Sequence, residues 1–346
     1  MRRIIAVAML VLALVAIPVA LAAAQGSEAE VEEVLASTSE VRGLEASPDV
    51  MVSYLSTAEL EEKMLQEFEE DTPEEEIRNA QDIMVMLGFI PEGLDLKQLY
   101  IDLYTEQIAG FYDPEDGSLY LISEDQSMDF MDRYILSHEL THYLQDENFD
   151  LSRPPFDDPD DAEEKTDDDA SFAATCLVEG DAMLTAEKWM MEAMTSGDFD
   201  HFDLGTQDYS TQVFDSSPEY IQDSLMFPYE EGQAFVERLY KEGGYKAVDR
   251  AYSEPPTTTE QIYHPEKYLA GEGPVEVKLP DLGGDLGGWE LAYDNVLGEF
   301  DVYELFKPYF SSRAAERAAE GWGGNRYHLY RGGGGELLLV QGYAWD

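Results

Sequence analysis

The stretch Ser137-His138-Glu139-Leu140-Thr141-His142 places two of the five histidines of this chain four residues apart, with a glutamate beside the first. In an α-helix, residues four apart lie on one face, about one turn from each other. His138 and His142 can therefore face one metal ion, while Glu139 projects to the side, where it can reach a water molecule without being a ligand. The alternative is a pair of surface or core histidines on an amphipathic helix. The apolar residues 134–136 argue against a surface helix.

A catalytic zinc site needs a third protein ligand and an open coordination position. The first histidine downstream is His201, in an irregular acidic stretch, and we interpret it as a surface residue. Glu179 is the better candidate, because a carboxylate in the apolar helix expected over about 170–194 is costly to bury unless it is paired or binds a metal. Gly180 beside it costs about 1 kcal/mol in a helix interior, which indicates a close backbone approach. The alternative for Glu179 is a solvated face of an acidic protein.

The charge of the chain is extreme, with 74 acidic against 21 basic residues and a net charge of −53. Such a surface repels nucleic acid and anionic membranes, which excludes both as partners. Self-repulsion of this size is tolerable mainly where salt screens it, so we expect a salt-adapted source. Calcium (Ca²⁺) sites are the rival explanation. The acidic run at 157–170 lacks the ligand register of an EF-hand and is better interpreted as a solvated loop.

The chain begins like an exported protein. Arg2 and Arg3 precede an uncharged segment, so residues 1–24 are interpreted as a signal peptide or an N-terminal membrane anchor. We expect an acidic linker over 25–50, with room for a short helix. The folded part would then comprise residues 51–270, with a helical lead-in over 51–109 and a core over 110–270. Residues 271–346 would form a C-terminal extension that packs on this core. A strand-like run close to the last residue allows for a missing C-terminal piece.

The local patterns predict an α+β protein that is mainly helical. Turn chemistry at 113–117 predicts a β-hairpin that joins Gly110–Tyr112 to Leu119–Ile122. Helices are expected over about 95–108, 130–145 and 230–241. A small antiparallel sheet or hairpin would therefore lie next to the helix that carries the two histidines.

The motifs together resemble the gluzincins, the thermolysin-like clan of zinc metallopeptidases. The runs SHELTHYLQD and LVEGDA carry the specific part of the likeness, and they are most similar to a little-described exported group of that clan. Three further stretches share it: QIAGFYDPEDGSLYLIS, FPYEEGQAFVERLY and TTTEQIYHPEKY. The resemblance extends from about Val41 to the C-terminus and implies a zincin-like domain.

The resemblance also implies roles for particular residues. His138, His142 and Glu179 would bind one catalytic zinc ion (Zn²⁺), and Glu139 would be the general base. The hairpin strand would be the sheet edge that holds an extended substrate, through Leu119, Tyr120, Leu121 and Ile122. One position departs from thermolysin, where an aspartate lies four residues after the ligand glutamate. Here that position is Met183, and the nearest carboxylate, Asp181, faces another side of the helix.

Further candidates complete the expected site. His264 is a candidate donor to the oxyanion, with Tyr268 and Tyr229 behind it. A hydrogen-bonded turn residue is the alternative for His264. Asp146, four residues beyond His142, is a candidate for orienting an imidazole, and a surface role is the alternative.

We therefore expect a zinc-dependent metallopeptidase that hydrolyses peptide bonds outside the cytoplasm, either secreted or anchored to the membrane. Its partners would be peptide or protein substrates, and contact with a membrane would be limited to the N-terminal segment. The alternative is a non-catalytic exported surface or scaffold protein that binds zinc or calcium. The presence of Glu139 argues against this alternative, since a structural metal site has no use for that carboxylate.

Overall fold

The computed structural model describes residues 28–45, 47, 50–71, 73–107, 110–114, 117–122, 128, 130–157, 166–196 and 211–345. Over these residues the chain is mainly helical with two small three-stranded sheets, which confirms the expected α+β class. The expected export segment, His201 and residues 158–165 of the acidic run lie outside the described residues. Within the described part, no helix is long and apolar enough to cross a membrane.

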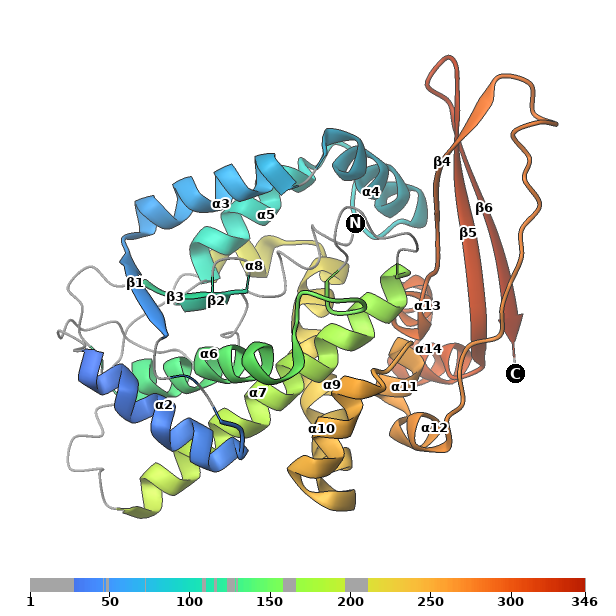
Figure 1. Cartoon of the computed structure of the whole chain (residues 1–346). Helices are drawn as coiled ribbons and strands as arrows, with labels where there is room; N and C mark the ends of the chain where they lie inside the picture. Colours follow the sequence, from blue (N-terminus) through green and yellow to red (C-terminus); the bar gives the residue numbers. More distant parts are fainter. Residues whose placement is uncertain are drawn as a thin grey trace.

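Three long helices form the centre of the molecule (Figure 1). They are α6 (Phe130–Phe149), α7 (Asp168–Ser196) and α9 (Glu219–Gly243). Helix α7 packs against both of the others, and most of its residues between 170 and 186 are buried, as its apolar sequence predicts. Helix α9 is about twice as long as expected, because it begins directly after Pro218 and continues through Pro228.

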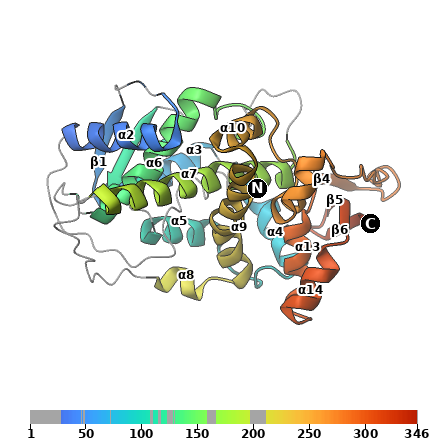
Figure 2. The same cartoon turned by 90° about the horizontal axis from the view of Figure 1, so that it is seen from below.

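Two glycines allow α7 and α9 to cross at close range (Figure 2). A Cβ atom at Gly180 would lie 2.1 Å from the backbone oxygen of Gly232, and one at Gly232 would lie 2.3 Å from the backbone oxygen of Cys176. Both distances are far inside van der Waals contact, and the obstructing atoms belong to the backbone. The close approach expected from Gly180 is therefore made by the facing helix.

The first sheet has the strand order β1-β3-β2. The predicted hairpin is present, with β2 (Gly110–Asp113) antiparallel to β3 (Ser118–Ile122). Strand β1 (Met51–Leu55) was not expected in the helical lead-in, and it pairs with β3 in parallel, so the sheet is mixed rather than antiparallel. The assignment of Leu119–Ile122 as a sheet edge is wrong, because β3 is hydrogen-bonded on both sides. The edge that contacts α6 belongs to β2.

The described helices of the lead-in are α3 (Thr57–Asp71), α4 (Glu74–Leu87) and α5 (Leu96–Gln107). Helices α3 and α5 lie beside the first sheet (Figure 1). Figure 1 shows the sheet between α3 and α5 on one side and α6 on the other. Lys63 of α3 lies over the ring of Tyr120 on β3, at 4.5 Å from its centroid, and over the ring of Phe111 on β2.

The described part of residues 25–50 is not the linker that we expected. Their main element is helix α2 (Glu28–Arg42), which packs on α6 and α7. Val31, Val34 and Leu35 are buried on one side of this helix, in one cluster with apolar residues of α6. The outer face of the helix is acidic, so the average polarity of the segment is high although one face carries a short apolar stripe at helical spacing. A linker was expected because only this average was considered.

The C-terminal part forms a second layer beside the helical centre. After α8 (Gln212–Ser216), α10 (Tyr245–Ser253), α11 (Thr259–Tyr263) and α12 (Pro265–Ala270), the chain makes strand β4 (Trp289–Asn295) and helices α13 (Glu299–Phe306) and α14 (Ser312–Ala319). A meander follows, in which β5 (Trp322–Gly332) pairs with β4 and with β6 (Leu337–Trp345). Tyr327 and Leu329 of β5 are buried against Ile83 of α4, so this sheet packs on the lead-in helices.

The helix crossing predicts a large effect of a small substitution. Gly180→Ala should lower the free energy of unfolding by about 3 kcal/mol, because the backbone of α9 cannot move away from the new methyl group without repacking. Urea denaturation measures this difference. Gly273→Ala is the matched control, since nothing lies within 4 Å of a Cβ there, and its effect should stay below about 0.5 kcal/mol. Equal effects at the two positions would contradict the crossing.

Candidate metal centre

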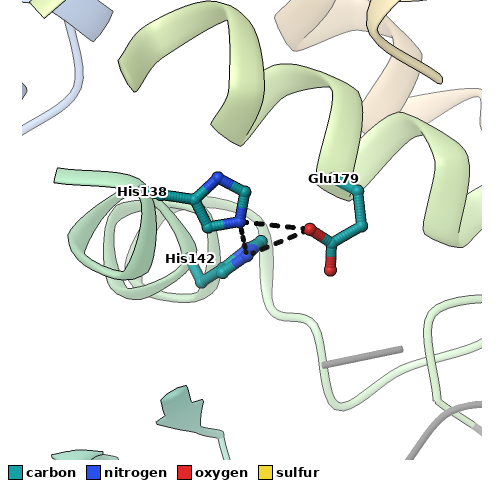
Figure 3. A group of neighbouring side chains, drawn as sticks. All are labelled: His138, His142 and Glu179. Carbon is teal, nitrogen blue, oxygen red and sulfur yellow. Dashed lines mark hydrogen bonds and ion pairs between the residues drawn. The ribbon is translucent and has the colours of Figure 1, made fainter. Parts of the chain in front are cut away.

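Helices α6 and α7 bring three metal-binding side chains together. His138 and His142 lie one turn apart on α6, and Glu179 faces them from α7 (Figure 3). The two Nε2 atoms are 3.1 Å apart, and Glu179 Oε2 is 3.2 Å from His138 Nε2 and 3.5 Å from His142 Nε2. The three residues expected to converge are thus neighbours, although 41 residues separate His138 from Glu179 in the chain.

These distances fit a metal ion with nitrogen and oxygen ligands. Ligands about 2.0–2.2 Å from a tetrahedral zinc ion lie about 3.3–3.6 Å apart, close to the three separations. Two imidazoles and one carboxylate suit zinc and related transition metals, whereas calcium takes six to eight oxygen ligands. Within the described part of the chain, these three residues are the one group of His, Cys, Asp and Glu placed to hold an ion.

The three groups are almost fully removed from solvent, at about 2% exposure each. Burial by itself would raise the pKa of Glu179, but the charge of His142 and hydrogen bonds from both histidines outweigh it and lower this pKa to about 2. Burial opposes protonation of His142, and the facing Glu179 raises the pKa of His142 to about 9. Burial lowers the pKa of His138. Glu179 is therefore a carboxylate, as a metal ligand must be.

Glu139 lies beside this group without belonging to it. Glu139 is 1% exposed, and burial raises its pKa to about 8 despite a hydrogen bond from the backbone N–H of Tyr112. Among the described residues, Oε2 of Glu139 has no hydrogen-bond partner. A Cβ atom at Gly110 would lie 3.8 Å from Glu139 Cγ, so the edge strand β2 borders this carboxyl directly. A buried carboxyl with a raised pKa and an orphan oxygen is typical of a group that exchanges protons.

The residue that orients His142 is Gln145, one turn further along α6. His142 Nδ1 donates to Gln145 Oε1 at 2.9 Å, and this directs Nε2 toward His138 and Glu179. The expected partner Asp146 is used elsewhere, because it accepts hydrogen bonds from the Tyr112 hydroxyl and the Leu151 backbone. Residues three apart on a helix share a face, so the spacing from His142 could have identified Gln145. Asp146 was expected instead because it is a carboxylate.

Asp181 does not belong to the metal group, but it hydrogen-bonds to Gln145, which in turn contacts His142. It is fully buried and accepts hydrogen bonds from Gln145 Nε2 at 3.2 Å, the Tyr252 hydroxyl at 2.9 Å and Arg42 Nε at 3.0 Å. The sequence alone did not indicate that Arg42 is the partner of Asp181, because Arg42 lies 139 positions upstream in the segment expected to be a linker.

The structure does not bring His264 or Tyr268 to the histidine pair. His264 Nε2 is 3.0 Å from Glu299 Oε1 on α13, so this imidazole forms an ion pair in a different part of the fold. The Tyr268 hydroxyl donates to the Glu254 backbone oxygen, and its ring packs against Phe235. Tyr229 of α9 is the aromatic candidate that does reach the site, with its ring centroid 6.2 Å from that of His138.

Comparison of the chain with protein-family models, with curated proteins and with solved structures finds no match. The interpretation of the site therefore rests on its own geometry and chemistry.

Glu179→Ala should abolish tight metal binding. Loss of an outer hydrogen-bond partner already weakens metal binding about 10–100-fold, and loss of a ligand should exceed that range. Elemental analysis after dialysis against zinc measures the effect. Glu187→Ala is the matched control, since Glu187 lies two turns further along α7 and hydrogen-bonds to Gln233. Unchanged metal content in Glu179→Ala would rule out its role as a ligand.

The His264–Glu299 pair predicts a pH-dependent contribution to stability. The hydrogen bond to Glu299 raises the pKa of His264 above its usual 6.5. The pair therefore stabilises the fold fully below pH 6.5, and this stabilisation is lost as the pH rises through the raised pKa. His264→Gln should cost about 1 kcal/mol at pH 6 and clearly less at pH 9, by urea denaturation. A loss of peptide cleavage at every pH, with stability unchanged, would instead favour the oxyanion role.

Proposed function

We propose that this protein is a zinc-dependent metallopeptidase of the gluzincin type, with a zincin-like arrangement around α6 and α7. The observation that supports this most is the convergence of His138, His142 and Glu179 at tetrahedral spacing, with Glu139 beside them and outside the ligand set. Two histidines and a glutamate are the ligands of thermolysin-type zinc sites, which leave a fourth position open. When bound there, zinc supplies Lewis acidity, which lowers the pKa of water and polarises a carbonyl group.

Glu139 would serve as the proton carrier of the reaction. A general base works best with a pKa near the operating pH, and burial raises that of Glu139 into this range. As a carboxylate it can accept a proton from an attacking water, and as the acid it can deliver that proton to the leaving amine. Its Oε2 atom is free for this exchange, while the N–H of Tyr112 holds the side chain in place.

The peptide substrate would bind along the free edge of β2. The Tyr112 N–H points from this strand toward Glu139 and away from β3. Backbone groups two residues apart in a strand share an orientation, so Gly110 presents its own groups to the same side. An extended peptide that pairs with this edge at Gly110 would have its backbone next to Glu139, whose carboxyl already accepts from the Tyr112 N–H. This assignment replaces β3, whose two edges are both occupied.

Location outside the cytoplasm remains part of the proposal and rests on the first 24 residues, with their two arginines and long uncharged segment. The large negative charge disfavours nucleic acid and anionic membranes as partners.

One observation favours a second candidate function. The two histidines, Glu139 and Glu179 are all at most 2% exposed, and structural metal sites are closed where catalytic ones are open. A non-catalytic role, in which the ion only ties α6 to α7, fits this burial. A non-catalytic role does not explain why Oε2 of Glu139 is buried with no hydrogen-bond partner among the described residues.

Glu139→Gln separates the two functions. The amide keeps the shape of the side chain but cannot accept the proton, so cleavage of a peptide library should fall about 10²–10⁴-fold while zinc content stays the same. Cleavage is followed by mass spectrometry, and zinc by elemental analysis. The control is Glu147→Gln on the same helix, which should cleave at the parent's rate. Cleavage by Glu139→Gln at the parent's rate would refute the mechanism, and a zinc-loaded parent with no peptidase activity would favour the structural role.

A further inference from the structure

A chain of buried hydrogen bonds leads from the metal group to helix α2. Its first link is Gln145, whose side chain is fully buried and satisfied at both ends. Oε1 accepts from His142 Nδ1, and Nε2 donates to the Val178 backbone oxygen at 2.9 Å and to Asp181 Oδ2 at 3.2 Å. Because both partners of Nε2 are acceptors only, the amide has one orientation. Oε1 must then face His142, so the proton of this imidazole lies on Nδ1 and Nε2 is left for the metal.

The second link is the charge that holds Asp181. Arg42 Nε is 2.8 Å from Asp181 Oδ1, and Arg42 Nη2 is 2.8 Å from Asp249. Arg42 and Asp181 are both fully buried, and the guanidinium lies over the ring of Tyr245, at 4.5 Å from its centroid. A buried carboxylate without a cation would destabilise the fold. Arg42 thus holds the Asp181 carboxylate in place, where it accepts from Gln145 Nε2.

We propose that Gln145, Asp181 and Arg42 are positioning residues for the metal ligand His142, so that helix α2, the first element of the described residues, sets the metal affinity of a site on α6 and α7. Arg42 acts through Asp181, and Asp181 acts through Gln145. None of the three touches the ion. The inference rests on the metal site of the proposed function, but it does not depend on peptide hydrolysis.

A purely structural role is the rival explanation, because a buried ion pair between α2, α7 and α10 also holds helices together. The two explanations predict different zinc affinities when the substitutions at Gln145 and Asp181 are combined. Positioning through Gln145 requires that the effect of Asp181 on metal affinity disappears once Gln145 is removed. General loosening of the fold predicts that the two effects add.

The experiment measures the zinc dissociation constant of the full chain by competition with a chelator, together with urea stability and the visible spectrum of the cobalt-substituted protein. Gln145→Leu should weaken zinc binding about 10–100-fold, and Asp181→Asn about tenfold. The double variant Gln145→Leu/Asp181→Asn should bind like Gln145→Leu alone, within about threefold. Both single variants should shift the cobalt spectrum, because the ring of His142 is reoriented.

Arg42→Met should resemble Asp181→Asn, and Arg133→Ala is its matched control. Arg133 also joins α2 to α6, through Glu30 at 3.0 Å, but it does not contact the buried network. It should leave zinc affinity and the cobalt spectrum unchanged. If Arg42→Met fails to fold, Asp181→Asn, which keeps the shape of the side chain, still decides the question.

Four outcomes would overturn the inference. Unchanged affinity in Gln145→Leu, or effects of Gln145→Leu and Asp181→Asn that multiply in the double variant, would show that positioning is absent while the metal site stands. An equal loss of affinity in Arg133→Ala and Arg42→Met would show that any contact of α2 matters. A parent protein that binds no zinc would remove the metal site itself, and the proposed function with it.

Discussion

The structure depends on the cost of removing charged groups from water. Glu179 is buried between helices, and a carboxylate in that position is stable only where cations or hydrogen-bond donors face it. His138 and His142 meet this requirement from α6, and their spacing of one turn lets both reach the same oxygen. This need and the apolar cluster that α6 shares with Ala186 and Trp189 of α7 hold the two helices together at the centre of the molecule. A group of three that neutralises itself in this way also has the composition and spacing of a metal site.

The segment around Glu179 shows how one stretch of helix serves several neighbours. Successive residues on a helix point about 100° apart, so three in a row face three directions. Glu179 faces the histidines of α6, Gly180 lies against the backbone of α9, and Asp181 faces Arg42 of α2. The short run Glu-Gly-Asp therefore sets the position of α7 against three other helices at once. A shift of α7 by one residue would place each of these side chains against the wrong partner.

Basic residues are scarce in this chain, so a buried one indicates where the fold needs a positive charge. Only 21 of 346 residues are Lys or Arg, and Arg42 is fully buried although it could have offset acidic residues on the surface. Its position between Asp181 and Asp249 places this cation where a buried carboxylate needs one. Salt can screen the repulsion between exposed carboxylates, but it has little effect on buried pairs. The surface and the buried network are thus subject to different constraints.

Much of the metal group could be predicted from local sequence. The periodicity of a helix placed His138 and His142 on one face, and an acidic residue inside an apolar helix indicated that Glu179 needed a partner. The β2–β3 hairpin followed from turn residues between two short apolar runs, and its pairing is confirmed. These features depend on neighbours within a few residues, and sequence encodes such relations directly. The expected fold class is also confirmed, since it reflects the sum of local preferences.

Contacts between distant segments were decided only by the tertiary structure. Strand β1 took one side of β3, which left β1 and β2 as the edges of the sheet, and no local pattern specifies which strand lies at an edge. His264 found Glu299 rather than the metal group, although its sequence context resembled that of a catalytic histidine. Arg42 reached Asp181 from a helix whose average polarity indicated a linker. A residue type and its spacing determine what a side chain can do, but the partner it meets depends on how helices and strands far apart in the chain pack together.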